Sequence, residues 1–464
     1  MSATPDIHVV ILAAGKGTRM KAARPKVLHP LGGMPLIEHV VTTARALGPA
    51  SITLVIGHQG DEVKAALSRQ PGLGFVVQEP QLGTGHALLV AEPVLAGTAG
   101  VVLLLYGDVP LLTAATARAL IAHHLQRQAA ATVLTARTER PTGYGRIVRG
   151  SDGRITRIVE ERDASADERR ITEINSGVYV FDLPAVFETL HRIGSRNAQG
   201  EYYLTDIVQA NCAAGRVVET VCVTDFTEIR GVNSQLELAE LGAELRDRRA
   251  RAVMAAGVTV IDPGSTWIGV DVEIGADTIL YPNTWIAGRT RIGRNCEIQS
   301  GSRLVDVEIG NDVLVRQHTV IEQSRVGSGA KLGPFTHLRP DSDVGNHAHV
   351  GNFVELKKTV LGEGAKANHL AYLGDATVGA RANIGAGTIT CNYDGVHKHQ
   401  TTIGEGAFIG SDSQLVAPVS VGDGAYVAAG STITQPVPPG ALGISRTPQT
   451  NKDGWVSKRR SGAS

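Results

Sequence analysis

Residues 12–20 have the composition of a loop that binds a phosphate chain. The segment Leu12-Ala-Ala-Gly-Lys-Gly-Thr-Arg-Met20 follows an apolar run and precedes Pro25-Lys26. A glycine-rich loop after a strand presents backbone N–H groups to phosphate oxygens, and Arg19 and Lys26 add positive charge where a triphosphate would lie. The spacing matches neither G-x-G-x-x-G, because Met20 replaces the third glycine, nor a Walker loop. The glycines alone also fit a plain turn, and the two cations favour phosphate binding.

Two further segments of the first half carry polar groups near apolar runs. Gln78 and Gln81–His86 could hydrogen-bond a base edge and admit a ring, although a surface turn explains them equally well. Asp108 follows the apolar run 101–105, where a carboxylate can hold Mg²⁺ on a phosphate. The alternative for Asp108 is a cap on the next helix. Residues 143–146, 160, 175–177 and 231–233 are polar or glycine-rich interruptions, and none of them is diagnostic alone.

His369, in the segment Lys366–Tyr372, is the candidate base of the second half. Arg339 and Lys357 precede it, and cations near an imidazole indicate a site for an anionic substrate with the histidine as general base. The alternative is a solvated surface histidine. His347-x-His349 could be metal ligands, but no carboxylate or cysteine set completes that site, so the sequence does not predict metal binding there.

The elements of the first half alternate between strand and helix, which predicts an α/β domain with a largely parallel sheet. Ligands of such sheets bind at the carboxyl ends of the strands. The expected strands are 8–15, 52–57, 74–77, 101–106 and 131–135, and the expected helices include 36–47 and 113–127. Apolar residues then recur at every third or fourth position over 228–256, which predicts a long linker helix that ends at Gly257.

A period of six replaces the helical pattern after Gly257. Six is the step of hexapeptide β-helix repeats, in which each aliphatic residue points into a triangular coil. The aliphatic residues are Ile268, Ile274, Leu280, Ile286, Ile292, Ile298 and Leu304, then after shifts Ile309, Val315, Ile321, Leu332, Leu338, Val344, Val350, Leu356, Ile403, Ile409, Leu415, Val421, Val427 and Ile433. Residues 385–402 predict an insert that projects from one face, and the pattern is expected to end after Gln435 in an extended or partly disordered tail.

The composition restricts the partners. Lys plus Arg equals Asp plus Glu at 45 each, so no basic field exists to hold nucleic acid, and small-molecule partners are expected. The four cysteines are scattered, which predicts reduced thiols and a cytoplasmic location. The chain shows neither a signal peptide nor an apolar run long enough to cross a bilayer.

Together these motifs resemble the bacterial family of bifunctional N-acetylglucosamine-1-phosphate uridyltransferase / glucosamine-1-phosphate N-acetyltransferase. The resemblance covers residues 8–455 and implies a Rossmann-like nucleotidyltransferase domain over 1–227, a linker helix over 228–256 and a left-handed parallel β-helix over 257–464. It implies acetylation of glucosamine-1-phosphate by acetyl-CoA, then transfer of UMP from UTP to give UDP-N-acetylglucosamine, which feeds the synthesis of peptidoglycan and lipopolysaccharide. It also implies a Mg²⁺ cofactor and a homotrimer with acyl sites between subunits.

The resemblance assigns roles to individual residues of both halves. Residues that match the uridylyl site are Leu12, Ala13, Ala14, Gly15, Arg19, Lys26, Gln78, Gly83, Thr84, Tyr106, Gly107, Asp108, Gly145, Glu160, Asn175 and Asn233, of which Asp108 and Asn233 match the Mg²⁺ ligands. His369 matches the general base. Residues that match the sugar-phosphate site are Arg339, Lys357, Tyr372 and Asn383, and those that match the acetyl-CoA site are Ala386, Asn392, Tyr393, Ser411, Ala429 and Arg446.

Two other hypotheses fit parts of the pattern. Nucleotidyltransferases for glucose-1-phosphate or mannose-1-phosphate also carry a β-helix after an α/β domain, but His369 and the insert argue against them. A regulatory or scaffold subunit could use the same two folds, but its glycine-rich loop should be degraded, whereas Arg19 and Lys26 are present here.

Overall fold

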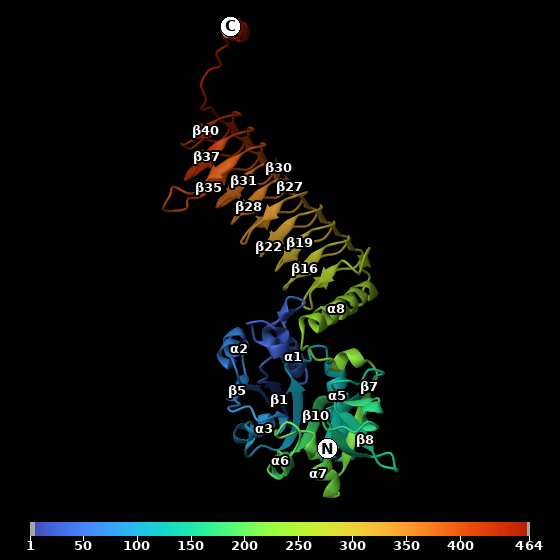
Figure 1. Cartoon of the computed structure of the whole chain (residues 1–464). Coiled ribbons are helices and arrows are strands. Elements are labelled where there is room, and N and C mark those ends of the chain that lie inside the picture. The colour runs from blue at the N-terminus through green and yellow to red at the C-terminus, as the bar shows by residue number, and fades with distance from the viewer. Residues whose placement is uncertain (1–4, 462–464) are drawn as a thin grey trace. The chain divides into compact units, whose positions relative to one another are not determined.

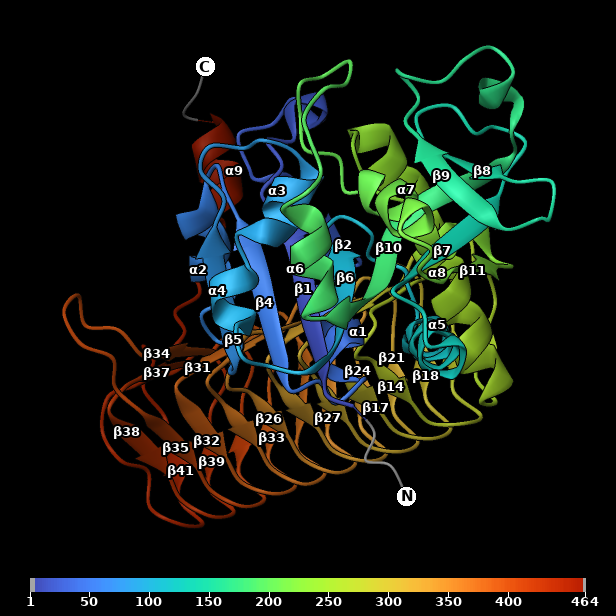
Figure 2. The same cartoon turned by 90° about the horizontal axis from the view of Figure 1, so that it is seen from below.

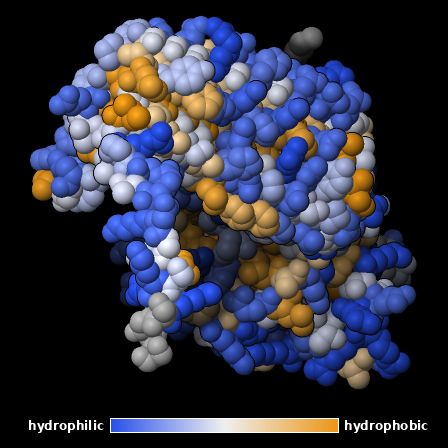
Figure 3. Space-filling model, turned by 90° about the horizontal axis from the view of Figure 1, so that it is seen from above, coloured by the Kyte–Doolittle hydropathy of each residue, from blue (hydrophilic) through white to orange (hydrophobic). Residues whose placement is uncertain are grey.

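The computed structural model describes residues 5–461 and divides the chain into two compact units, which meet within helix α8 (Gln235–Ala255) at Leu245 and Arg246. Figure 1 shows the chain in colour from the N-terminus to the C-terminus. None of the helices in the described range combines the length and apolar character that crossing a bilayer requires. Hydrophilic side chains dominate the face shown in Figure 3, and apolar ones form small groups on it.

The first unit is built on one mixed sheet with the strand order β11-β7-β10-β6-β1-β4-β5. Its strands are β1 (Ile7–Ala13), β4 (Ser51–Ile56), β5 (Leu73–Val77), β6 (Gly100–Tyr106), β7 (Ala131–Arg137), β8 (Arg146–Arg149), β9 (Ile155–Val159), β10 (Glu173–Leu183) and β11 (Val218–Val223), beside a small hairpin of β2 (Pro30–Leu31) and β3 (Met34–Pro35). Strands β5, β4, β1 and β6 run parallel, as expected. The sheet is largely parallel, as predicted, and β10 is the exception in this order, because it pairs antiparallel with both β6 and β7.

Helices cover both faces of this sheet (Figure 2). They are α1 (Leu36–Arg45), α2 (Gly60–Ala66), α3 (Thr84–Leu89), α4 (Glu92–Leu95), α5 (Ala114–Arg127), α6 (Ala185–Leu190) and α7 (Asp206–Ala213). Alternate residues of a strand point to opposite faces, so Val9 and Ile11 pack with α1 and α5, whereas Val10 and Leu12 pack with α3, α6 and α7. Burial of both faces explains why these strands are continuous apolar runs.

The long helix begins later than its apolar spacing suggests. Residues Phe226–Ile229 form a short 3₁₀ turn, and α8 begins only at Gln235 rather than at Glu228. Two hydrogen bonds fix this start: the N–H of Glu237 donates to Ser234 Oγ at 3.2 Å, and the N–H of Asn233 donates to the Glu237 carboxylate at 2.6 Å. This reciprocal arrangement resembles a capping box, a signal that apolar periodicity alone does not carry.

The second unit is a β-helix of three sheets of parallel strands. The first sheet holds β12 (Thr259–Val260), β15 (Ile279–Leu280), β18 (Glu297–Ile298), β21 (Leu314–Val315), β24 (Lys331–Leu332), β27 (His349–Asn352), β30 (Lys366–His369), β33 (Asn383–Ile384), β36 (Phe408–Ile409), β39 (Tyr426–Val427) and β41 (Leu442–Gly443). The second holds β13 (Trp267–Ile268), β16 (Trp285–Ala287), β19 (Arg303–Val305), β22 (Val320–Glu322), β25 (His337–Leu338), β28 (Glu355–Lys357), β31 (Tyr372–Gly374), β34 (Ile389–Cys391), β37 (Gln414–Val416) and β40 (Thr432–Ile433). The third holds β14 (Glu273–Ile274), β17 (Arg291–Ile292), β20 (Glu308–Ile309), β23 (Arg325–Val326), β26 (Asp343–Val344), β29 (Val360–Leu361), β32 (Ala376–Val378), β35 (Thr401–Ile403) and β38 (Val419–Val421).

The aliphatic residues of the six-residue period form the core of this unit, as predicted. Nearly all of them are buried in one continuous cluster, and Ile274, near the first coil, is only partly buried. Each coil stacks on the next in register, for example Leu280 on Ile298 and Ile298 on Val315. The core therefore has the one-dimensional order of a solenoid.

Two boundaries of the repeat differ from the prediction. The projecting loop is 392–400, because β34 keeps Ile389–Cys391 in the coil, so the expected insert of 385–402 begins too early. The repeat also continues past Gln435, since Val437 bridges Val421 and β41 pairs with β39. A short helix, α9 (Trp455–Ser461), follows in the tail, which was expected to be extended or partly disordered.

Candidate active sites

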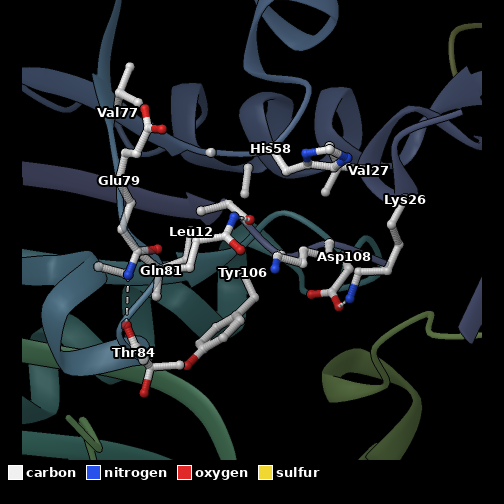
Figure 4. A pocket seen from close by; sticks show the side chains of 18 of the residues that line it. Leu12, Lys26, Val27, His58, Val77, Glu79, Gln81, Thr84, Tyr106 and Asp108 are labelled. Carbon is white, nitrogen blue, oxygen red and sulfur yellow. Dashed lines mark hydrogen bonds and ion pairs between the residues drawn. The ribbon is translucent and has the colours of Figure 1, made fainter. Parts of the chain in front are cut away.

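The first candidate site is a cavity of about 900 Å³ in the first unit, at the carboxyl ends of β1, β4, β5 and β6 (Figure 4). Eleven of the sixteen residues predicted for the uridylyl site line it: Leu12, Ala13, Ala14, Gly15, Lys26, Gln78, Gly83, Thr84, Tyr106, Asp108 and Asn233. Parallel strands end at the same edge of a sheet, so segments far apart in the sequence converge here. The topology therefore explains why the loop after β1, the segment 77–84 and Asp108 line one cavity.

Four polar side chains meet at one end of this cavity. The Lys26 ammonium forms an ion pair with the Asp108 carboxylate and donates to Asn233 Oδ1 at 3.2 Å. Arg19, which does not line the cavity, donates to the same Asn233 oxygen at 2.8 Å. The side chains of Lys26 and Asp108 are only 15% and 14% exposed, so their attraction is little screened by water. Figure 4 shows them facing one another.

The oxygens of Asp108 and Asn233 fit a hard divalent cation. Both are within hydrogen-bonding reach of the same Lys26 ammonium, so the two oxygens face the same positive charge. Mg²⁺ typically takes one or two protein oxygens and fills its other positions with phosphates and water. One carboxylate and one amide oxygen match this sparse ligation. Among residues 5–461 no group of three or more His, Cys, Asp or Glu side chains could hold a metal ion.

A second group of predicted residues adjoins the cavity through Tyr106. A Cβ on Gly145 would lie 3.5 Å from the Asn175 Cβ and 3.6 Å from Glu160 Oε1, so these three residues form one small wall. Burial, together with the carboxylates of Glu160 and Asp108, raises the pKa of the Tyr106 phenol, so Tyr106 lies between the two groups. Its ring packs on Gly177, where a Cβ would approach within 2.8 Å and where φ is +84°, so only glycine fits.

Gly107 packs against neighbouring residues and does not line the cavity. Its N–H donates to the Leu12 carbonyl at 2.9 Å, and a Cβ would lie 2.6 Å from the Ile37 side chain. It thus ties the Asp108 turn to the end of β1. This arrangement explains why Gly107 belongs to the motif without lining the cavity.

The cavity also contains side chains that the sequence analysis missed. His58 follows β4 at the same edge of the sheet as Asp108, so the rule that selected Asp108 could have selected it. The Gln81 amide donates to the Ala14 carbonyl. Glu201 reaches the cavity because the Tyr202 N–H donates to the Leu82 carbonyl at 2.8 Å. That contact joins segments about 120 residues apart, and no local pattern indicates it.

The second candidate site follows the edge between the first and second sheets of the β-helix, which we call the first edge. Asn352, His369, Ala386, Ser411 and Ala429 stack along it, one to a coil. A backbone hydrogen bond joins each of the first four residues to the next coil. The Leu370 N–H donates to the Asn352 carbonyl at 3.1 Å, and the Gly387 N–H donates to the His369 carbonyl at 3.4 Å. The Asp412 N–H donates to the Ala386 carbonyl at 2.7 Å, and the Gly430 N–H donates to the Ser411 carbonyl at 2.8 Å. The Arg446 guanidinium donates to the Ala429 carbonyl at 2.6 Å and continues the row.

His369 is exposed at this edge, and one of its ring nitrogens is already engaged. Its Nδ1 lies 2.8 Å from Asn352 Oδ1, one coil earlier. An amide oxygen accepts hydrogen bonds, so Nδ1 carries the proton and Nε2 has a free lone pair. The neutral tautomer held in this way can accept a proton at Nε2.

Cations gather on the second sheet next to this edge. Lys357 Nζ lies 3.0 Å from Asp375 Oδ2, and Arg339 Nη1 lies 3.0 Å from Glu355 Oε1. Lys398, on the projecting loop and absent from the predicted set, is adjacent: the ammonium of Lys357 lowers the pKa of Lys398, and Arg339 acts in the same direction. Three cations are therefore close together here, and two of them are already paired with carboxylates, Lys357 with Asp375 and Arg339 with Glu355.

The other predicted residues of this half lie on both sides of the edge. The Tyr372 hydroxyl and the Asn392 amide lie over Gly374, where a Cβ would be 2.4 Å and 2.7 Å from them. Asn392 also donates to Asp375 at 2.5 Å. Asn383 lies on the first sheet in β33, and Tyr393 is exposed on the loop 392–400. The predicted sugar-phosphate set is therefore divided between two sheets.

Comparisons with known proteins match both halves of the chain. Residues 9–209 match the MobA-like NTP transferase domain, and residues 400–435 match the bacterial transferase hexapeptide family. Together with the observed sheets, these matches confirm the predicted fold class, an α/β nucleotidyltransferase domain and a left-handed parallel β-helix.

Relatives named bifunctional protein GlmU match almost the whole chain. The protein from Geotalea uraniireducens is 49% identical over 98% of this chain and 100% of its own length. That from Trichlorobacter lovleyi is 50% identical over 97% and 98%, and that from an Anaeromyxobacter species is 52% identical over 100% and 94%. The chain therefore belongs to the GlmU family of bifunctional enzymes, in which a nucleotidyltransferase domain precedes a hexapeptide-repeat acetyltransferase.

Proposed function

We propose that the second unit transfers the acetyl group of acetyl-CoA to glucosamine-1-phosphate, and that the first unit then transfers UMP from UTP to the N-acetylglucosamine-1-phosphate formed. The products are UDP-N-acetylglucosamine and pyrophosphate. The observation that carries the proposal is the convergence of Lys26, Arg19, Asp108 and Asn233 at one end of a cavity that Gln78 and Gly83 also line. A nucleoside triphosphate needs both a cationic end and a polar edge for its base.

In the first unit, the phosphate of the sugar attacks the α-phosphorus of UTP in line, and pyrophosphate leaves. The loop 12–15 presents N–H groups to the phosphates, and Lys26 and Arg19 neutralise charge that develops in the transition state. Gln78, Gly83 and Thr84 hold the base, whereas Gly145, Glu160 and Asn175 hold the sugar. Both reactants are already reactive, so positioning and charge neutralisation suffice.

A nucleotidyltransferase of this family implies a divalent metal ion, and we propose Mg²⁺. Asp108 and Asn233 would hold it, and when bound it would neutralise negative charge on the phosphates. Lys26 would then release the Asp108 carboxylate and turn to a phosphate. This exchange gives Lys26 a role both with and without nucleotide.

In the second unit, His369 Nε2 accepts a proton as the sugar amine attacks the thioester carbonyl. The tetrahedral adduct then collapses to the amide, the C–S bond breaks, and CoA leaves as the thiol with the proton that His369 returns. The Asn352 amide holds the imidazole in the tautomer that the first step requires. Arg339, Lys357 and Tyr372 bind the sugar phosphate with Asn383, and the row Ala386, Ser411 and Ala429 with Asn392, Tyr393 and Arg446 binds acetyl-CoA. The N–H near Ala386 would stabilise the oxyanion.

We also propose that the chain forms a homotrimer through its β-helices. A triangular coil has three flat faces, and three such prisms can pack around one axis with cyclic closure. The exposed first edge then receives its second wall from a neighbouring copy. The domain boundaries at 227 and 257, and a cytoplasmic location, stay predictions.

A product assay with glucosamine-1-phosphate, acetyl-CoA, UTP and Mg²⁺ tests both activities. Omission of each component in turn should stop the sequence at a defined intermediate: without UTP, N-acetylglucosamine-1-phosphate accumulates. Substitution of glucose-1-phosphate and mannose-1-phosphate is the control for the sugar. Uridylyl transfer to either of them at the same efficiency, with no consumption of acetyl-CoA, would contradict the proposal.

A further inference from the structure

Arg146 is almost completely buried in the first unit, although no role in the reaction has been given to it. Its side chain is 1% exposed and opens strand β8. A buried guanidinium is expensive, and removal from water is offset only when its N–H groups are paired. The Nε of Arg146 has no hydrogen-bond partner within the described residues, so this burial is not optimised for stability.

The guanidinium closes a ring of contacts around the turn 143–145. One terminal nitrogen donates to the Tyr144 carbonyl, and the other donates to Glu161 Oε2 at 2.6 Å. The same Glu161 oxygen accepts the Gly143 N–H at 3.1 Å. The turn is thus held at both of its first two residues by one ion pair, and its third residue is Gly145.

The residue that this ring presents faces the sugar half of the first site. The Gly145 carbonyl accepts the Asn175 N–H at 2.9 Å, and Gly145 lies against Glu160 as described above. Burial raises the pKa of Glu160, the carboxylates of Asp163 and Asp206 raise it further, and Thr205 and Arg146 oppose the rise. Arg146 therefore acts on both the backbone and the charge of this wall.

We propose that Arg146 is a positioning residue for the sugar-phosphate substrate of uridylyl transfer: with Glu161 it holds the turn 143–145 so that Gly145, Glu160 and Asn175 form one binding wall. This inference rests on the proposed function and gives a role to a residue that contacts no substrate itself. Because the ring lies behind the sugar wall and not behind the loop 12–15, loss of Arg146 should affect the sugar phosphate and not UTP.

Steady-state kinetics with each substrate varied in turn tests the role. Arg146→Met keeps the apolar length of the side chain and removes its hydrogen bonds, so the KM for N-acetylglucosamine-1-phosphate should rise roughly 10- to 100-fold, the range expected for charged hydrogen bonds, with the KM for UTP within about twofold. Arg146→Lys should fall between wild type and Arg146→Met. Glu161→Gln, at a more exposed position, should shift the same KM in the same direction if Arg146→Met does not fold.

Arg149→Met is the matched control. Arg149 lies on the same strand and pairs with Glu173 at 2.5 Å, so Arg149→Met removes another ion pair of β8 and leaves the contacts of the turn in place. Acetyl transfer by the same chains reports that the rest of the molecule is intact. An equal rise of both KM values, no rise at all, or the same split in Arg149→Met would each overturn the inference.

A wild-type chain without uridylyl transfer would contradict the proposed function instead. In that case calorimetric titration with N-acetylglucosamine-1-phosphate still decides the role of Arg146. Binding that weakens in Arg146→Met and not in Arg149→Met supports it, and equal binding by all three chains overturns it.

Discussion

The two candidate sites differ in how much of a binding surface one chain provides. In the first unit, Asp108 and Lys26 are only 14% and 15% exposed inside a cavity of about 900 Å³. In the second unit, His369, Ser411 and Arg446 are exposed along an edge. Parallel strands of an open sheet end together and enclose a ligand from several sides, whereas a solenoid stacks its coils in a line. Residues of one chain therefore enclose the first cavity, whereas the second row of residues lies on an exposed surface, for which we proposed a second wall from a neighbouring copy.

Asp108→Ala should give the largest effect, since it removes a charged group from the enclosed site. We expect uridylyl transfer to fall by roughly 10³-fold or more, because metal-ion stabilisation of a phosphoryl transition state is worth several kcal/mol. Acetyl transfer should stay within about twofold, because the substitution lies in a separate compact unit. Coupled pyrophosphate release and thiol release measure the two activities. Asp61→Ala, at an exposed position of α2, is the control, and an equal loss of acetylation in a folded Asp108 variant would contradict two independent sites.

His369→Ala tests the exposed site in the same way. Acetyl transfer should fall by the ~10²- to 10⁴-fold that a general base contributes, while uridylyl transfer persists. His347→Ala is the control, because His347 is exposed at another edge, between β26 and β27. A pH–rate profile of the variant that retained the acidic limb of the wild-type profile would identify a different group as the base.

Light scattering tests whether the open edge is completed by another copy. We expect the full chain and the β-helix half to be trimers, and the first unit alone to be a monomer that still transfers uridylyl groups. That fragment needs the sequence through Ala255, since residues 1–227 omit Asn233 of the cavity wall. Dilution below the association range should remove acetyl transfer and leave uridylyl transfer, and a monomer with full acetyltransferase activity would exclude a shared site.

His124 gives a smaller effect, on stability rather than on activity. It is 2% exposed and lies 3.0 Å from Thr132 Oγ1, and burial, with the nearby charge of His123, lowers its pKa to about 4. Below pH 6.5 His124 is protonated in the unfolded chain but stays neutral in the folded chain. The contribution of His124 to the free energy of unfolding is therefore constant above pH 6.5 and falls towards pH 4. Between pH 7.5 and pH 5 this group should cost the first unit about 2 kcal/mol.

Urea unfolding of the wild type and of His124→Gln at the two pH values measures this contribution. On acidification, the free energy of unfolding of the variant should fall by about 2 kcal/mol less than that of the wild type. The other histidines are the same in both chains, so their contribution cancels in this comparison. Equal losses in both chains would show that His124 does not titrate as its burial requires.

The sequence predicted the architecture well where a period or a strand end carries the information. Nearly every residue of the six-residue period is buried in the β-helix core, although that core also holds many residues outside the list, such as Val326, Leu361 and Val378, and the strand-end rule located Asp108. Asn352 was missed although a signal existed, because it lies 17 residues before His369, one coil earlier. Glu201 and the antiparallel β10 had no such signal, since both depend on pairing between distant segments. The capping bonds that delay α8 to Gln235 likewise depend on a few polar residues rather than on apolar spacing.

The stacking places residues at regular intervals along the first edge. Adjacent coils are separated by the spacing of neighbouring strands, so the three steps from His369 to Ala429 span about 14 Å at roughly 4.8 Å each. An elongated co-substrate that lies along the edge is therefore measured in whole coils. Insertion or deletion of one complete coil between Ala386 and Ala429 would keep every side chain on its own face and change only the distance. Evolution could in this way adapt the scaffold to longer or shorter donors without redesign of the catalytic histidine.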